Sequence, residues 1–237
     1  MTASLQSFPA GGMAVVLGAS GGIGQALTRA LAASGQFETV LGLSRRADGF
    51  DLTDEASIAQ AAATVGAAGY PVRLVLLATG LLHEGALQPE KTWRQLDGAA
   101  LTRSFAVNAI GPALVLKHFL PLLPRQGKAV FAALSAKVGS IGDNRLGGWY
   151  GYRAAKAALN QLVHTAAIEL ARSRPEAICL TLHPGTVATP LSAPFAGVGH
   201  APLPPDAAAV RLLDVLERAR PIDTGTMLDH TGLPLPW

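Results

Sequence analysis

Short apolar runs alternate with helix-like segments along most of this 237-residue chain. The apolar runs predict strands at residues 13–17, 39–43, 72–77, 128–134 and 177–182. Helical patterning predicts helices at residues 23–33, 54–65, 96–123, 150–172 and 206–219. Apolar strands that alternate with helices are typical of a parallel sheet covered on both faces. Because no linker or repeat divides the chain, the sequence predicts one doubly wound α/β domain spanning residues 1–237, with its site at the carboxyl ends of the strands.

The composition excludes several classes of protein. Only 15% of the residues are charged and 49% are hydrophobic, so the chain can bury a large core and is not disordered. The single cysteine rules out an internal disulfide, and without a cluster of Cys and His residues we expect no metal site. The net charge of +3 comes without a block of basic residues, which argues against nucleic acid as a partner. We also expect no membrane span, which needs about 20 apolar residues. The N-terminus lacks a basic leader, so we expect a cytoplasmic protein.

A glycine-rich turn follows the first predicted strand, with the sequence Gly18-Ala19-Ser20-Gly21-Gly22-Ile23-Gly24. Glycines in such a turn let the backbone approach a pyrophosphate closely, and the amide groups that start the next helix then face the phosphate charge. The alternative is a glycine turn that only packs a helix on a strand. The position of this turn between the first strand and a helix favours the binding of a dinucleotide.

Two arginines follow the second predicted strand, in the sequence Ser44-Arg45-Arg46. An acidic residue near this position would accept hydrogen bonds from the ribose 2′-hydroxyl of NAD, whereas a guanidinium suits the 2′-phosphate of NADP. The sequence therefore favours NADP(H) over NAD(H) as cofactor. The alternative is a pair of solvated arginines on a loop.

Four side chains further along the chain could transfer protons or polarise a substrate. Tyr152 and Lys156 lie one turn apart on a predicted helix, and the ammonium is expected to lower the pKa of the phenol. Ser135 follows the fourth predicted strand, so its hydroxyl can donate to a substrate carbonyl. Asn108 lies four residues before Pro112, which cannot bond to its carbonyl and so leaves that oxygen free for a water or an ammonium. The alternatives are an ordinary helix with a half-buried tyrosine and a simple proline kink.

Together these motifs resemble those of the classical short-chain dehydrogenase/reductase family, over nearly the whole chain. The resemblance implies a single-domain Rossmann-type fold and a catalytic tetrad of Asn108, Ser135, Tyr152 and Lys156. It also implies a set of cofactor contacts around the glycine turn and the strand ends. These contacts are Gly18, Ser20, Gly22, Ile23, Gly24, Ser44, Arg45, Arg46, Asp51, Leu52, Ala78, Thr79, Gly80, Asn108, Tyr152, Lys156, Pro184, Gly185, Val187 and Thr189.

Flanking segments resemble one branch of this family, the C-factor-like and sniffer-like carbonyl reductases. These segments are residues 107–112, 138–144, 147–150 and 232–237. The separation of 17 positions between Ser135 and Tyr152 is ordinary for that branch. Tyr150 is a nearby competitor for the catalytic role, but the position where its lysine would lie, 154, is an alanine.

Two features depart from the family pattern. The family's Asn-Asn-Ala-Gly motif reads Leu77-Ala78-Thr79-Gly80, so we expect this loop to be less well braced. Only residues 47–50 separate Arg46 from Asp51, whereas a parallel crossover with its helix needs at least about a dozen residues. We therefore expect the family's helix between the second and third strands to be missing or shortened, and its third strand to be short or absent.

The resemblance implies an NADP(H)-dependent oxidoreductase that transfers hydride between the nicotinamide and a carbonyl or alcohol substrate. In that mechanism Tyr152 is the general acid or base, Ser135 polarises the carbonyl, Lys156 holds the nicotinamide ribose and Asn108 anchors a water chain. The proline-rich segment 187–205 is expected to be a mobile loop over a small, apolar substrate. Family members commonly pair through the helix of Tyr152, which implies a homodimer or homotetramer. The alternatives are a cofactor-binding signalling or regulatory protein with little turnover, and a methyltransferase, which would need no such tetrad.

Overall fold

A six-stranded parallel sheet forms the centre of the computed structural model, which describes residues 4–195 and 201–237. The strand order is β2-β1-β3-β4-β5-β6. The strands are β1 (Met13–Leu17), β2 (Thr39–Leu43), β3 (Val72–Leu77), β4 (Ala129–Leu134), β5 (Ala177–His183) and β6 (Met227–Asp229). The five predicted strands are confirmed to within one residue at each end. Strand β6 was not predicted, because three residues carry too little pattern to be recognised.

Helices connect the strands and agree closely with the predicted segments. They are α1 (Gly22–Ser34), α2 (Arg45–Asp48), α3 (Glu55–Ala67), α4 (Gly98–Phe105), α5 (Gly111–Phe119), α6 (Tyr150–Ser173) and α7 (Pro205–Arg218). The helix predicted at 96–123 is one run in which a π-helical turn, Ala106–Ile110, joins α4 to α5. By length and composition alone, the run Gly98–Leu122 could cross a membrane. Its residues Val115 and Phe119 are buried in the protein core, however, and have no accessible surface.

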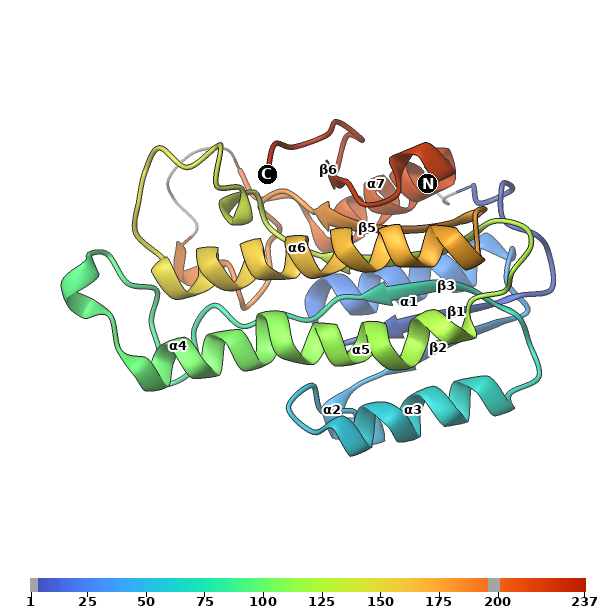
Figure 1. The fold of residues 1–237 in the computed structure, drawn as a ribbon, viewed down its shortest axis with the longest axis horizontal. Coiled ribbons are helices and arrows are strands. Elements are labelled where there is room, and N and C mark those ends of the chain that lie inside the picture. Colours follow the sequence, from blue (N-terminus) through green and yellow to red (C-terminus); the bar gives the residue numbers. More distant parts are fainter. Residues whose placement is uncertain (1–3, 196–200) are drawn as a thin grey trace.

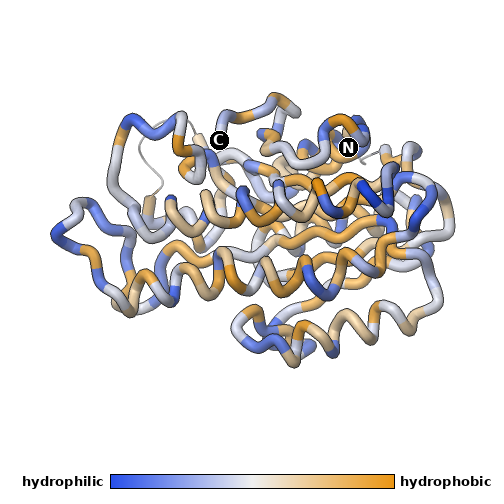
Figure 2. Tube along the Cα trace, in the orientation of Figure 1, coloured by the Kyte–Doolittle hydropathy of each residue, from blue (hydrophilic) through white to orange (hydrophobic). Residues whose placement is uncertain are grey.

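Strand β1 illustrates how both faces of the sheet are covered. All five of its residues are buried, and alternate residues belong to two separate hydrophobic clusters. Val15 packs with residues of α3, α5 and α6, whereas Val16 packs with residues of α1 and α7. Figure 1 shows α3, α5 and α6 across the near face of the sheet, with α1 and α7 behind it. The sheet strands are correspondingly hydrophobic in Figure 2. The predicted doubly wound fold is confirmed.

The stretch from the end of β2 to Asp51 is short, as the spacing of Arg46 and Asp51 predicted. Helix α2 has four residues, and in the part of the chain that the structure describes no strand lies between β2 and β3, so β2 forms the edge of the sheet. The following loop packs on the long helix instead. A β-carbon on Gly111 would lie 2.5 Å from the carbonyl oxygen of Leu52, so only glycine permits this approach. This contact places Asp51 and Leu52 beside the carboxyl ends of β1 and β3.

Candidate active site

The glycine turn after β1 is shaped by close contacts that a side chain would block. Gly18 has a φ of 91°, and a β-carbon there would lie 2.7 Å from Cγ2 of Thr79 and 3.0 Å from the carbonyl oxygen of Ala78. A β-carbon on Gly24 would overlap the carbonyl of Gly18. Helix α1 then begins at Gly22 without a side chain to cap its first amide groups. Such free amides at a helix start suit an anionic group.

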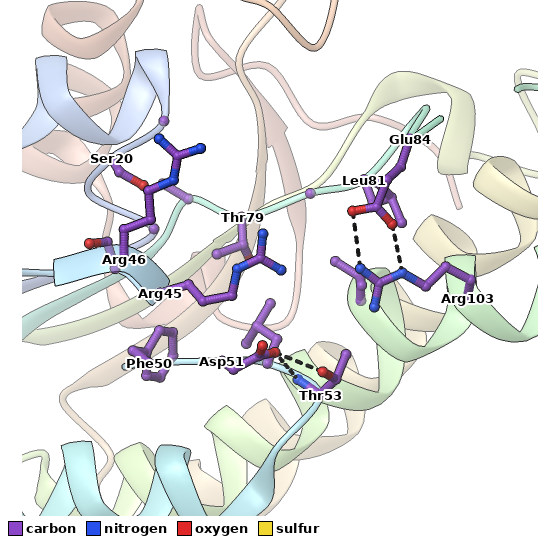
Figure 3. Close-up of a pocket in the computed structure, with 17 residues that line it drawn as sticks. Ser20, Arg45, Arg46, Phe50, Asp51, Thr53, Thr79, Leu81, Glu84 and Arg103 are labelled. Carbon is purple, nitrogen blue, oxygen red and sulfur yellow. Dashed lines mark hydrogen bonds and ion pairs between the residues drawn. The ribbon is translucent and has the colours of Figure 1, made fainter. Parts of the chain in front are cut away.

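A cavity of about 450 Å³ opens beside this turn, at the carboxyl ends of β1, β2 and β3. It brings together half of the residues predicted to contact the cofactor, and Figure 3 shows its lining from close by. The lining includes Gly18, Ser20, Ser44, Arg45, Arg46, Asp51, Leu52, Ala78, Thr79 and Gly80 from that prediction, together with Gly21, Phe50, Thr53, Leu81, Glu84, Arg103 and Val107. The cavity therefore joins the glycine turn, the arginine pair and the loop after β3 into one site.

The wall of this cavity after β2 is basic. Arg45 and Arg46 are exposed at the start of α2 and line the cavity, and neither forms an ion pair with a described residue. Asp48 is the nearest carboxylate in the sequence, but its Oδ2 atom accepts hydrogen bonds from the backbone N (2.8 Å) and the hydroxyl (3.2 Å) of Ser44. Asp48 therefore closes α2 on itself and is not part of the cavity wall.

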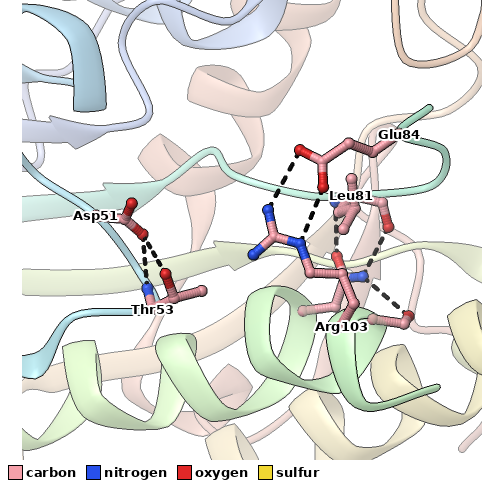
Figure 4. A network of polar contacts seen from close by, with 7 residues as sticks. Asp51, Thr53, Leu81, Glu84 and Arg103 are labelled. Atoms are coloured by element: carbon pink, nitrogen blue, oxygen red, sulfur yellow. Dashed lines mark hydrogen bonds and ion pairs between the residues drawn. The ribbon is translucent and has the colours of Figure 1, made fainter. Parts of the chain in front are cut away.

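The opposite wall carries an ion pair that the sequence analysis missed. Arg103 on α4 donates to both carboxylate oxygens of Glu84, at 2.9 and 3.3 Å (Figure 4). Asp51 lies between the two walls, and its Oδ1 atom accepts from the backbone N and the hydroxyl of Thr53. These bonds, with the charges of Arg45 and Arg103, lower the pKa of Asp51. Arg103 lies four residues, about one helical turn, before Val107, which lines the same cavity, but no motif in the sequence singles out either residue as part of a site.

The side chain of Asn108 braces the loop after β3. Its Oδ1 atom accepts from the backbone N of Leu81 (2.9 Å), and its Nδ2 atom donates to the carbonyl of the same residue (2.7 Å). The loop is therefore held at Leu81 by a side chain from the π-helical turn, although it lacks the family's two asparagines.

Lys156 lies where the predicted tetrad converges. It is 2% exposed, its Nζ atom donates to the carbonyl of Leu134 at 2.8 Å, and it lies 5.8 Å from the ring centre of Tyr152. A β-carbon on Gly80 would lie 3.8 Å from this Nζ atom and 3.7 Å from Oδ1 of Asn108. The lysine thus joins the end of β4, the tyrosine and the loop after β3.

The protonation of Tyr152 differs from the prediction. Burial raises the pKa of Tyr152 to about 12, whereas burial lowers the pKa of Lys156 to about 8. The expected lowering of the pKa of Tyr152 by the ammonium is therefore wrong for this chain, because loss of solvation of the phenolate dominates at this depth. The phenol is protonated throughout the neutral range.

Ser135 follows directly on the residue that holds the lysine. Its backbone N donates to the carbonyl of Leu182 (2.8 Å), which fixes it at the end of β4. Its hydroxyl is buried and has no hydrogen-bond partner among the described residues. A buried hydroxyl without a hydrogen-bond partner lowers the stability of the protein. A ligand oxygen that accepts a hydrogen bond from this hydroxyl would therefore bind favourably.

The segment after β5 lies beside the glycine turn. Gly185, which follows Pro184, has a φ of 77°, and a β-carbon there would lie 3.3 Å from the ring of His230. Further along, a β-carbon on Gly22 would lie 2.8 Å from Cγ2 of Thr189. The predicted cofactor contacts after β5 therefore adjoin those of the glycine turn. Glycine is needed at both positions for this approach.

Two contacts tie this segment to its surroundings. Val187 is 3% exposed and pairs with Leu203 in a parallel bridge, which joins both ends of the predicted loop 187–205. The ring of Phe195 lies 5.7 Å from that of His83, whose Nε2 atom is 3.3 Å from the carbonyl oxygen of Pro190. Residues 196–200 of the predicted loop lie outside the described residues.

A model of the short chain dehydrogenase family matches residues 12–196 of this sequence. The chain belongs to the short-chain dehydrogenases. It is 34% identical to the C-signal protein of Myxococcus xanthus over 143 aligned residues. The aligned region covers 60% of this chain and 81% of that protein. It is 29% identical to 1-hydroxy-2-glutathionyl-2-methyl-3-butene dehydrogenase of Rhodococcus sp. (strain AD45), over 94% of this chain and 98% of that enzyme.

Solved short-chain dehydrogenase structures agree with this assignment. The NADPH-bound carbonyl reductase from chicken fatty liver superposes with a TM-score of 0.84 at 25% identity, over 98% of this chain and 96% of that one. The carbonyl reductase Sniffer of D. melanogaster shares the fold, with a TM-score of 0.79 at 21% identity over 96% and 100% of the two chains. The similarities to C-signal and to these reductases confirm the predicted branch of the family.

The buried ammonium of Lys156 gives stability a defined pH dependence. Between pH 8 and 10.5 the unfolded chain holds the lysine proton and the folded chain releases it, so the free energy of unfolding rises with pH in this window. The drop in pKa from 10.5 to about 8 corresponds to about 3 kcal/mol. We expect wild-type stability relative to Lys156→Met to increase by this order, measured by urea unfolding from pH 7 to 10.5. A constant difference would contradict the assignment.

Proposed function

We propose that this short-chain dehydrogenase reduces an apolar carbonyl compound with NADPH, and that Tyr152 donates the proton. The observation that carries the proposal is the position of Lys156, whose Nζ atom contacts the carbonyl of Leu134 beside Ser135 and lies 5.8 Å from the Tyr152 ring. An ammonium, a phenol and an unpaired hydroxyl are thus gathered beside a cavity that is shaped to take a dinucleotide.

The residues of the cavity fit NADPH. Gly18, Gly22 and Gly24 form a cradle that β-carbons would fill, and the amide groups at the start of α1 face a pyrophosphate placed there. Arg45 and Arg46 would hold the 2′-phosphate, since a guanidinium binds phosphate through two parallel hydrogen bonds. The occurrence of NADPH in the superposed chicken liver reductase supports the same choice.

The chemistry follows from the protonation states of the site. When bound, the reduced nicotinamide supplies a hydride to the carbonyl carbon of the substrate. The Ser135 hydroxyl donates a hydrogen bond to the carbonyl oxygen and so stabilises the negative charge that develops on it. Tyr152 then transfers its phenolic proton to that oxygen, which completes the alcohol. Lys156 stabilises the resulting phenolate, and Asn108 is proposed to anchor the waters that return the proton.

The raised pKa of Tyr152 fits its proposed role as proton donor. A phenol with a pKa of about 12 is protonated at neutral pH, which is the form that reduction requires. The ring centre of Trp149 lies 6.3 Å from that of Tyr152 and 5.2 Å from that of Phe195, and these rings give the approach an apolar character. A small, apolar carbonyl compound fits both properties. The loop around residues 187–205 is proposed to move when the substrate enters.

Replacement of Tyr152 by phenylalanine tests the proton donor. Loss of general acid catalysis should lower kcat by about 100-fold or more, without loss of NADPH affinity. The measurement is NADPH oxidation with a panel of ketones, aldehydes, quinones and pterins. Tyr150→Phe, on the first residue of α6, is the matched control and should leave kcat unchanged.

Full activity of Tyr152→Phe would contradict the mechanism. A wild-type protein that binds NADPH but oxidises none of it with any of these carbonyl compounds would instead favour the regulatory alternative.

Removal of the arginine pair tests the cofactor. Each charge-assisted bond to phosphate contributes about 1.5–3 kcal/mol, so Arg45→Ala with Arg46→Ala should weaken NADPH binding by about tenfold or more. Binding of NADH, which lacks the 2′-phosphate, should change little; fluorescence titration measures both. Arg94→Ala, which removes an arginine stacked on Trp93 outside the cavity, is the control. Unchanged NADPH affinity in the double variant would rule out the phosphate assignment.

The α6 surface supports the proposed homodimer or homotetramer. Leu162 and Ile168 on this helix are 37% and 50% exposed, and an apolar groove of about 540 Å³ separates α6 from α5. We expect sedimentation analysis to give twice or four times the chain mass of 24.4 kDa. Leu162→Lys should lower this mass, whereas Ile222→Lys, on an exposed residue of another surface, should not. A wild-type mass of 24.4 kDa would contradict the proposal.

A further inference from the structure

A buried carboxylate lies in the loop between β3 and α4, outside the predicted tetrad. Glu90 is only 8% exposed, and it forms no ion pair with any residue in the described part of the chain. A carboxylate taken out of water loses free energy unless hydrogen bonds replace its solvation. Its partners therefore indicate what it does.

The partners of Glu90 are the amide groups at the start of α6. The backbone N of Gly151 donates to the side-chain Oε2 atom of Glu90 at 3.2 Å. The backbone N of Trp149 donates to the backbone carbonyl oxygen of Glu90 at 2.5 Å. The first amides of a helix have no partner within the helix and carry a partial positive charge, so a carboxylate stabilises them. A β-carbon on Gly151 would lie 3.0 Å from Oε1 of Glu90, and glycine therefore permits the close fit.

Trp149, which is held by this contact, has a strained backbone. Its φ of 54° makes it the one residue other than glycine with a positive φ among residues 4–195 and 201–237. A bulky residue rarely adopts this left-handed conformation, and it persists only where neighbouring contacts enforce it. The hydrogen bond to Glu90 supplies such a contact. The conformation directs the indole towards Tyr152, at 6.3 Å between ring centres, and towards Phe195.

We propose that Glu90 is a positioning residue for Tyr152. Its carboxylate holds the amide group of Gly151, directly before Tyr152, and so fixes the first turn of α6. Its backbone carbonyl holds Trp149, whose indole packs on the phenol, and this second contact does not depend on the side chain. The inference rests on the proposed role of Tyr152 as proton donor. The role needs an acceptor oxygen at this place and does not need a negative charge.

Two variants of similar size separate the acceptor from the charge. Glu90→Gln keeps an oxygen that can accept from Gly151, whereas Glu90→Met keeps the length of the side chain without that oxygen. We expect Glu90→Met to lower kcat by up to about 100-fold through misplacement of the phenol, with NADPH affinity unchanged. Glu90→Gln should retain most of kcat, and its pH profile should match that of the wild type.

A measurement without substrate tests the clamp directly. Hydrogen–deuterium exchange of the peptide covering residues 149–155 should be faster in Glu90→Met than in the wild type and in Glu90→Gln, because local opening of the helix start is no longer opposed. Asp54→Ala, which removes the cap from α3, is the matched control. It removes a helix cap of the same kind from a helix without tetrad residues, and should change neither this peptide nor kcat.

The outcomes distinguish this inference from the proposed function. Wild-type kcat and exchange in Glu90→Met would overturn the positioning role, even if Tyr152→Phe is inactive. A loss of kcat in Glu90→Gln equal to that in Glu90→Met, or a shifted pH profile, would also overturn it, because the charge would then matter. An inactive wild type with faster exchange only in Glu90→Met would refute the proposed function and leave the clamp established.

Discussion

The buried ammonium of Lys156 is the interaction on which the site depends. A charge with 2% exposure is tolerated only with a polar partner, and the carbonyl of Leu134 at 2.8 Å provides one. That carbonyl is the last of β4, so the end of the strand fixes the lysine in space. The lysine in turn lies beside Tyr152 on the same helix. Gly80 lies close to both the Nζ atom of Lys156 and the Oδ1 atom of Asn108. One buried charge thus joins α6 to the end of β4 and lies close to the loop after β3.

Close backbone contacts set the spacing around this charge. Gly18 lies against the end of β3, and Gly22 lies against Thr189, so the turn after β1 contacts two further loops of the site. Gly111 similarly lets the long helix approach Leu52. A methyl group at any of these positions would separate elements that must meet for one cavity to form. The glycines of this chain therefore act in the site through packing as well as through backbone freedom.

The departures from the family pattern are compensated locally. No strand follows the four-residue helix α2 before β3 in the described chain, so β2 lies at the edge of the sheet. The loop that carries Asp51 packs on the long helix at Gly111. The loop after β3 lacks its two asparagines, yet Asn108 bonds to both backbone groups of Leu81. In both places the long helix supplies the contact that is missing from the loop. Its π-helical turn, which contains Asn108, is thus a structural support as well as a proposed part of the proton relay.

The sequence by itself determined the doubly wound fold and the place of the glycine turn, because these follow from periodicity and from the order of strands and helices. The resemblance to a family added the predicted cofactor contacts, half of which line one cavity. The sequence also determined the short stretch from β2 to Asp51, which is a matter of counting residues. Only the tertiary structure decided that burial raises the pKa of Tyr152, because desolvation depends on atoms from distant segments. The ion pair of Arg103 with Glu84 and the clamp of Glu90 on α6 likewise join residues 19 and 61 positions apart. No local pattern encodes such contacts, since they exist only after the sheet has brought its loops to one edge.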